Sequence, residues 1–525
     1  MIEKEHTDMA PEPRLRRSIQ ALQQDYDKGK KKPLEDLWRA WIGIQRLPHD
    51  DPNSLFTLAG YHGMPGNYCN HGNVLFPTWH RAYMLKVEDA LRSIDGCESV
   101  TLPYWDETDT DSLTDGIPAV FTRDSVSLDG NTIPNPLRSY TLPVNLQDVA
   151  IDGADYSKAA GYQTVRYPLS GLVGTEEDRL KTAEHNQLFA DNARNISLLN
   201  QNIVTWLKWT VIDDGEPTAA GQVADRFKRC LGAPNYTVFS NTTSAGQWNT
   251  NNPPERVISL ESPHNAMHLA VGGFDLPGFD ASPIAGANGD MGENDTAAFD
   301  PIFYFHHCFI DYVFWLWQKQ NSFTDRLDII GGFPGTSSSD DVSPPGTPDN
   351  TALTLQTPLK PFVIDDNGNS RPMTSADCVN IETQLGIRYE PGSLEEDARD
   401  AAFEDQAGPP AKVLAVSEIN RSAIRGSFLI SVFGNVGGRR VRLGTEAVLS
   451  RWDVAGCSNC QTHLEAKASF EVPTAGTGVM VAATAADIDD RATYDVEIRT
   501  RQGDITQRPT GIADAATPLY RLDLY

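Results

Sequence analysis

The sequence has no long uninterrupted run of apolar residues. Its most apolar segment, residues 309–317, is interrupted by Asp311, whereas a membrane-spanning helix requires about 20 consecutive apolar residues. Residues 1–6 also lack the basic flank and the apolar stretch of a secretory signal. We therefore expect no membrane as a partner and a cytoplasmic location.

Basic residues and cysteines are both scarce. The 525 residues include 44 lysines and arginines against 71 aspartates and glutamates, and the resulting net charge of −27 argues against nucleic acid as a partner. The seven cysteines are an odd number and lack the spacing of a disulfide framework, which is typical of a reducing compartment. Apolar residues make up 40% and charged residues 22%, so the chain is expected to fold as a globular protein.

The pattern of apolar residues divides the chain into two parts. Apolar residues recur at helical spacing in residues 14–24, 34–44, 76–94, 177–193, 197–209 and 301–319, while residues 101–167 are rich in Asp, Pro, Gly and Thr and favour loops. Alternation with a period of two appears later, in residues 427–432, 439–443, 468–472, 479–483 and 494–500. We predict a mainly α catalytic domain with long loops over residues 1–392, an acidic linker over 393–411 and a small all-β domain over 412–525.

Seven of the eleven histidines lie in three short tracts: His62, His71 and His80; His264 and His268; His306 and His307. His264 and His268 are four residues apart, so both rings would lie on one face of a helix and could bind one ion. His80 and His307 lie in apolar helical segments, and His62 and His71 are expected in a loop rich in Gly, Asn and Pro.

A single histidine on an apolar helix is usually a hydrogen-bonded core residue rather than a metal ligand. Two sets of three imidazoles are more specific, because they would suit copper, zinc, iron or nickel and leave room for a small bridging molecule. The spacing alone does not choose among these metals.

Two segments carry a resemblance to a known family. Cys69-Asn70-His71-Gly72-Asn73, followed by Phe76-Pro77-Thr78-Trp79-His80-Arg81, resembles the copper A motif of tyrosinases. Residues 259–273 and 300–307 resemble the copper B motif. The resemblance covers about residues 14–389 and is strongest to the fungal-like branch of type 3 copper proteins. Residues 444–460 are similar to the shielding domain of latent fungal tyrosinases.

The resemblance implies a four-helix bundle that holds two copper ions, with dioxygen as co-substrate, and the oxidation of monophenols and o-diphenols to o-quinones. It assigns His62, His71 and His80 to copper A. It assigns His264, His268 and His307 to copper B, since the family's ligand is seven residues after Asp300. His306 would support the ligands from outside. Asp311 would either orient this region or form an ordinary salt bridge between helices.

The family also implies roles for three residues that are not copper ligands. Cys69 would form a thioether with His71, the alternative being a buried free thiol. Glu261 and Asn265 would hold a water that accepts the phenol proton, although Glu261 could instead stabilise a helix amino terminus. Glu255 is a rival for the glutamate, and Leu269 would line the entrance.

By the same resemblance, the C-terminal domain would cover the copper site and insert one side chain until proteolysis or acid removes the cover. Val448, Leu449 and Trp452 are the candidates for that side chain. Cys457 and Cys460 form a Cys-x-x-Cys pair that would carry copper during loading, the alternative being two thiols in a turn. Residues 387–389 keep only the last aromatic of the family's usual tyrosine motif, with Arg14, Arg16 or Arg17 as its basic partner.

Three other functions are compatible with some of these features. An oxygen carrier would share the two copper sites, but the chain length and the solitary site argue against it. A catechol oxidase would accept only diphenols, and Asn265 argues against that. A binding protein with zinc or an empty histidine site would be distinguished by metal analysis. The sequence leaves open the natural phenol and the oligomeric state, and a homo-oligomer is compatible with it.

Overall fold

The computed structural model describes residues 13–148, 155–172, 174–208, 211–213, 216–218, 223–252, 255–276, 288–337, 351–366, 368–395, 412–436, 439–456, 463–472, 494–501, 503–506 and 519–525. The helices are α1 Ile19–Asp27, α2 Lys32–Arg46, α3 Leu55–His62, α4 Phe76–Arg92, α5 Thr110–Asp115, α6 Glu176–Gln187, α7 Asn192–Lys208, α8 Val223–Cys230, α9 Tyr236–Ser240, α10 Thr242–Asn251, α11 Glu261–Gly272, α12 Ile302–Gln320 and α13 Ile381–Leu385.

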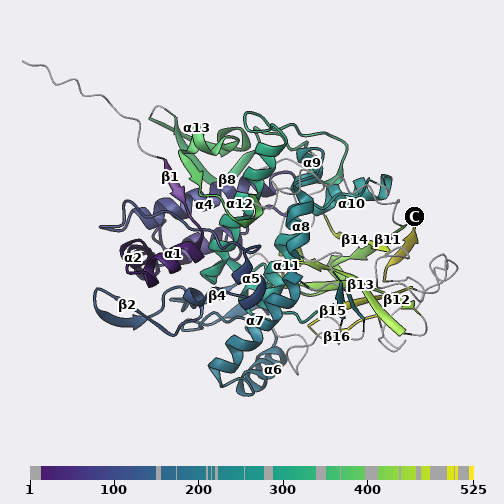
Figure 1. Ribbon diagram of the computed structural model, residues 1–525, viewed down its shortest axis with the longest axis horizontal. Coiled ribbons are helices and arrows are strands. Elements are labelled where there is room, and N and C mark those ends of the chain that lie inside the picture. Colours follow the sequence, from purple (N-terminus) through teal and green to yellow (C-terminus); the bar gives the residue numbers. More distant parts are fainter. Residues whose placement is uncertain are drawn as a thin grey trace, which may run out of the picture.

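The strands fall into two groups. Short ones accompany the helices: β1 Arg14–Arg16, β2 Ser125–Leu128, β3 Asn131–Pro134, β4 Leu146–Gln147, β5 Ser157–Lys158, β6 Val211–Asp213, β7 Glu216–Thr218, β8 Pro358–Asp366, β9 Asn369–Thr374 and β10 Ile387–Tyr389. The C-terminal strands are β11 Lys412–Asn420, β12 Phe428–Val436, β13 Arg439–Val448, β14 Glu465–Val472, β15 Tyr494–Thr500, β16 Gly503–Asp504 and β17 Arg521–Leu524. Figure 1 shows these strands beside the helices, with α8, α10 and α11 between the two parts.

Two helices lie at the centre of the helical region, residues 13–395. Every residue of α11 is buried, and α12 is buried along nearly its whole length. A helix that is buried on all sides must be covered by other elements. Accordingly α4 packs on α12, and α7 and α8 pack on α11. The predicted mainly α catalytic fold is thus confirmed.

Most of the predicted helices are present, but the first prediction is wrong at its start. Residues 14–16 form β1, which pairs in parallel with β10 at the other end of the helical region. The helix begins only at Ile19, because the Ser18 side chain accepts a hydrogen bond from Ala21 N and caps it. The predicted loop region 101–167 contains the short helix α5 and the hairpin β2–β3.

Arg16 is the basic partner of the tyrosine at the end of the helical region. Its Nη1 donates to Tyr389 Oη at 2.9 Å, and its Nε donates to Glu88 on α4 at 2.8 Å. Asp311 on α12 accepts from Tyr389 at 2.6 Å and from Arg81 Nε at 2.5 Å. The hydrogen bonds and ion pairs of Asp311 therefore join α12 to α4, β1 and β10.

The C-terminal β region, residues 412–525, has its own core between two sheets. One sheet has the order β14–β11–β17 and the other the order β13–β12–β15–β16, and all their pairings are antiparallel. Apolar side chains from both sheets, among them Val416, Ile430 and Phe470, form one buried cluster. The period-two prediction is confirmed for β12, β13, β14 and β15. It missed β11, β16 and β17, and the predicted segment 479–483 lies outside the described residues.

The β region is docked tightly on the helical region. Leu429, Ala447, Leu449 and Trp452 belong to the same apolar core as the helices, and β13 packs on α11. The predicted linker 393–411 lies almost entirely outside the described residues. None of the helices described combines the length and the apolar character that crossing a membrane requires.

Candidate metal centre

The clustered histidines come from four helices and one loop. His62 is the last residue of α3, His80 lies in α4, His264 and His268 lie in α11, and His307 follows His306 in α12. His71 lies in the loop between α3 and α4. The expectation that His62 lies in a loop is wrong, since Ser54 caps α3 and the helix runs to His62.

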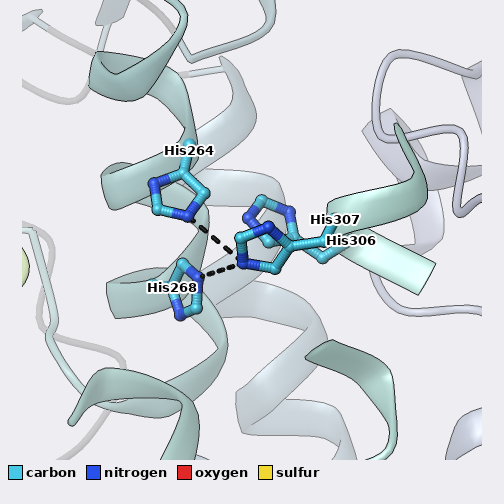
Figure 2. A group of neighbouring side chains, drawn as sticks. All are labelled: His264, His268, His306 and His307. Carbon is cyan, nitrogen blue, oxygen red and sulfur yellow. Dashed lines mark hydrogen bonds between the residues drawn. The ribbon is translucent and has the colours of Figure 1, made fainter. Parts of the chain in front are cut away.

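The histidines assigned to copper B converge on one point, as Figure 2 shows. His307 Nε2 lies 3.3 Å from His264 Nε2 and 3.2 Å from His268 Nε2. Three nitrogens bound to one ion at about 2.0–2.1 Å in tetrahedral geometry would be about 3.3 Å apart. The separations therefore fit a shared metal ion.

Hydrogen bonds orient the rings of this set. His268 Nδ1 donates to Met291 O at 2.8 Å, and His264 Nδ1 donates to Asn265 Oδ1 at 2.9 Å. Because each Nδ1 carries the hydrogen, each Nε2 presents its lone pair. His80 is held in the same way, with Nδ1 donating to Phe76 O at 2.8 Å.

The histidines assigned to copper A form a second group beside the first. The ring centroids of His62, His71 and His80 are 5.1–5.5 Å apart. Among the described residues, neither ring nitrogen of His62 nor Nε2 of His80 has a hydrogen-bond partner. The His80 ring stacks on that of His307 at 4.4 Å. Buried, unsatisfied nitrogens of this kind are costly unless a ligand binds them.

All six rings are neutral near pH 7. Burial lowers the pKa of His80 to about 3, and burial together with the neighbouring histidines holds the pKa of the other five well below the usual value. Neutral imidazoles are the form that binds a metal ion. The donor set suits copper, and no carboxylate or thiolate pair competes among the grouped histidines of α11 and α12.

His306 lies against this set but faces a different partner. Its Nδ1 is 2.5 Å from Glu107 Oε1, and its ring stacks on His264 with centroids 5.3 Å apart. Burial raises the pKa of Glu107 well above its usual value. Glu107 was not predicted from the sequence, because a glutamate in a loop 199 residues before His306 carries no local signal.

Glu261 and Asn265 lie at the opening of the histidine site. Glu261 Oε1 accepts from Gly72 N at 2.8 Å, and Oε2 accepts from Thr242 N at 2.9 Å and from its hydroxyl at 3.0 Å. Burial raises the pKa of Glu261 despite these bonds. Glu255 is exposed at the surface, while Leu269 is fully buried in α11.

A cavity of about 280 Å³ lies at this opening, between the helical region and the β region. We call it the mouth cavity, and its lining includes His71, Glu261, Asn265, Arg421, Val448, Leu449 and His463. Trp452 does not line it. Its Nε1 donates to Asp155 at 2.9 Å, and its ring packs against Gly174. Another cavity, of about 310 Å³, lies between α10 and β14 and contains none of the clustered histidines.

Cys69 is buried close to both His62 and His71. Its Sγ and one ring nitrogen of each histidine lie within 4.8 Å of one another. Asn294 Nδ2 donates to the sulfur at 3.7 Å, and Arg451 Nη2, from the β region, donates at 3.5 Å. Arg451 was not predicted from the sequence. Cys457 and Cys460 lie outside the described residues.

Comparison with known proteins agrees with this site. The chain matches the common central domain of tyrosinase over residues 52–320. It is 51% identical to the tyrosinase HcTyr2 of Hahella sp., covering 93% of this chain and 92% of that one. It is 44% identical to a tyrosinase of Aspergillus oryzae over 83% of this chain and 85% of that one.

Solved structures give the same result for the whole chain. The structure of a tyrosinase from Burkholderia thailandensis at low pH is 46% identical, covers 98% of this chain and 100% of its own, and has a TM-score of 0.83. The structure of the apo-pro-tyrosinase of Aspergillus oryzae, at 18% identity and a TM-score of 0.64, shares the fold. The chain therefore belongs to the tyrosinase family, and its buried histidine cluster is a type 3 dicopper site.

Proposed function

We propose that this tyrosinase oxidises both monophenols and o-diphenols to o-quinones, and that its C-terminal β region keeps it latent. The observation that carries the proposal is the mouth cavity, which has the histidine site on one side and the β region on the other. Its volume of about 280 Å³ is near the lower end for small-molecule sites, which suits a one-ring phenol.

In this proposal, His62, His71 and His80 hold copper A, and His264, His268 and His307 hold copper B. The separations of the copper B nitrogens and the unsatisfied nitrogens of His62 and His80 support the assignment. When bound, the two copper ions supply the site where dioxygen binds and the phenol is oxidised. His306 supports α12 through Glu107.

A monophenol must lose its proton, and its pKa of about 10 requires a base close to the hydroxyl. Glu261 and Asn265 fill this role by holding a water that accepts the proton. A carboxylate has about four acceptor positions, and three donors occupy those of Glu261, so one remains for a water. Asn265 faces the same cavity.

Latency rests on how the β region is held over the mouth cavity. Val448 and Leu449 line that cavity and are buried, so one of them is the side chain that blocks it. Trp452 instead anchors the β region, through Asp155. Ion pairs that join the two regions, Arg226–Glu446 at 3.1 Å and Arg451–Asp295 at 2.8 Å, add to the anchorage. The domains are residues 1–392 and 412–525, joined by the linker 393–411.

Oxygen uptake with a monophenol and with a catechol tests both parts of the proposal. We expect little uptake by the full chain, and uptake of both substrates after limited proteolysis in the linker or deletion of residues 393–525. Equal rates and lag before and after removal would exclude latency. Uptake with the catechol alone would make the protein a catechol oxidase.

Metal analysis of the purified chain separates this function from a zinc or empty site. We expect two coppers per chain, bound only when the six histidines are intact. Replacing Cys457 and Cys460 by Ser should slow copper uptake without changing the final ratio, because we propose that this pair carries copper only during loading.

We propose further that the enzyme works in the cytoplasm. The five cysteines within the described residues are all buried, and none is in a disulfide, which fits a reducing compartment. Cell fractionation tests the location, and light scattering tests whether the chain forms a homo-oligomer.

A further inference from the structure

Arg451 belongs to the C-terminal β region, but its side chain reaches into the helical region. Its side chain is only 2% exposed, and its Nη1 pairs with Asp295 Oδ1 at 2.8 Å. The neighbouring backbone is held too, since Trp452 N donates to the other oxygen of Asp295 at 2.7 Å. The guanidinium is therefore fixed in place by the docked domain.

Among the described residues, the remaining hydrogen bonds of the Arg451 side chain all reach one short segment, residues 62–71, which we call the copper A loop. Nη1 donates to Asn67 Oδ1 at 2.6 Å, and Nη2 donates to His62 O at 3.2 Å and to Cys69 Sγ at 3.5 Å. The loop begins at one predicted ligand, His62, and ends at another, His71. One side chain from the β region thus bonds the loop at three points.

The copper A loop also contacts the backbone of the segment that carries Asp295. Met64 N donates to Asp295 O at 3.1 Å. At Gly63 a Cβ would lie 2.1 Å from the same oxygen, so only glycine allows this approach. Asp295 therefore holds the loop through its backbone and Arg451 through its carboxylate. Loop, Asp295 and Arg451 form one unit.

We propose that Arg451 is a positioning residue for copper A: it holds the copper A loop so that His62 and His71 bind the ion and Cys69 meets His71. The inference rests on the proposed copper A ligands and thioether. On this view the β region helps to build the site that it later covers, and maturation takes place while the two regions are docked.

The cross-link itself requires an oxidant. The Cys69 S–H hydrogen and one ring C–H hydrogen of His71 are lost as the S–C bond forms. Dioxygen, the co-substrate of the enzyme, takes up the two electrons and two protons and leaves as hydrogen peroxide. Arg451 takes no part in this transfer. It fixes the sulfur at the ring, within the group in which Cys69 Sγ, His62 and His71 lie within 4.8 Å of one another.

Arg451→Met in the full chain tests the inference, with Arg501→Met as the matched control. Arg501 is also an arginine of the β region with a largely buried side chain, 8% exposed; its Nη2 lies 3.8 Å from Asp178 on α6, and among the described residues it has no hydrogen bond to the copper A loop. Apo-protein is exposed to Cu²⁺ in air. Copper per chain, the affinity for each copper and the cross-link are then measured, the last as a peptide two hydrogens lighter.

We expect the first copper to bind Arg451→Met normally and the second about 10- to 100-fold more weakly than in the wild type, as for other groups that hold metal ligands in place. The cross-link should form in a correspondingly smaller fraction of chains. Arg451→Lys should recover only part of both, because an ammonium cannot make the same set of forked bonds. Arg501→Met should match the wild type.

The inference is overturned if Arg451→Met and Arg501→Met behave alike in both measurements. If Arg451→Met does not fold, Asn67→Gly replaces it. Asn67 has a φ of 58°, which glycine adopts readily, so this change removes one bond and leaves the backbone unstrained. It should reduce the second copper affinity in the same direction, and wild-type behaviour would reject the inference. If the wild type binds two coppers without a cross-link, the thioether fails and Arg451 is judged on copper affinity alone.

Discussion

At the scale of single residues, Glu261 connects the two halves of the dicopper site. Glu261 is the first residue of α11, the helix that carries His264 and His268. Its carboxylate accepts a hydrogen bond from the backbone N–H of Gly72, the residue after His71. The same carboxylate lines the mouth cavity. In the function that we propose, Glu261 therefore has two separable roles, one in holding the loop and one in accepting a proton through water.

Glu261→Gln separates these roles. Glutamine can still accept from Gly72 N, but it cannot accept a proton at neutral pH. We expect kcat for a monophenol to fall by about 100-fold or more, the usual size of general-base catalysis, while kcat for a catechol changes little. Steady-state oxygen uptake on the proteolysed enzyme measures both values.

Glu255→Gln is the control for this prediction, since Glu255 is exposed and does not line the mouth cavity. It should leave both substrates unaffected. An equal loss with monophenol and catechol in Glu261→Gln would assign the residue to holding Gly72 alone.

At the scale of elements, the site depends on how strand β1 is joined to two helices. Arg16 is fully buried and bonds Glu88 of α4, Asp311 of α12 and Tyr389 of β10. His80 and His307 lie on those two helices, so β1 and β10 fix the helices that carry one proposed ligand of each copper. This contact spans 373 residues of the chain.

Replacing Arg16 by Met should destabilise the helical region strongly. The change leaves Glu88 and Asp311 buried without one of their charge partners, which typically costs about 3–5 kcal/mol. Denaturant unfolding of the apo-protein measures the loss.

Arg14→Met is the comparison, because Arg14 also bonds Glu88, at 3.2 Å, but its side chain is 25% exposed. Because Arg14 is partly open to solvent, which screens its charge, we expect a smaller loss for Arg14→Met than for Arg16→Met. Equal losses in the two variants would show that burial of Arg16 has no special weight.

At the scale of the whole molecule, acid should weaken the docking of the β region. Glu471 on β14 faces Arg229 of α8 and Arg256, with Asp225 of α8 nearby. Burial alone would raise the pKa of Glu471, but the two arginines lower it below the usual value of about 4.5. The ion pairs of Glu471 therefore stabilise the docking fully at pH values above the usual glutamate pKa. Their contribution is lost as the pH falls through the lowered pKa of Glu471. Burial raises the pKa of Asp295, so the titration of Asp295 favours docking as the pH falls, opposite to that of Glu471.

Under the latency that we propose, Glu471→Gln should make the enzyme easier to activate. The variant lacks the carboxylate that binds both arginines, so we expect part of the activity to appear without acid and the midpoint of acid activation to move to higher pH. Oxygen uptake at neutral pH, after brief incubation at a series of lower pH values, measures that midpoint. An unchanged midpoint would remove Glu471 from the pH response. Lys467→Gln, a neighbouring β14 residue whose ammonium pairs with Glu465, serves as the control.

Much of the site could be predicted because its signals are local. His264 and His268 share one helical face through their spacing, and α4 and α12 show continuous apolar periodicity. Residues 14–16 look helical in isolation, and only the pairing with β10 makes them a strand. Glu107 and Arg451 carry no periodic or motif signal, since each acts on histidines or loops far away in the chain.

The sequence by itself determined the mainly α plus β composition through its hydrophobic period, and its two histidine motifs determined the family and, through the family, the metal, because periods and motifs are properties of neighbouring residues. The tertiary structure decided how the parts combine. It placed Val448 and Leu449 rather than Trp452 at the mouth cavity, paired Arg16 with Tyr389, and set Arg451 of the β region against the copper A loop. These contacts join residues hundreds of positions apart. Their free energy depends on burial and on the relative orientation of the paired groups, which exist only after the chain has packed.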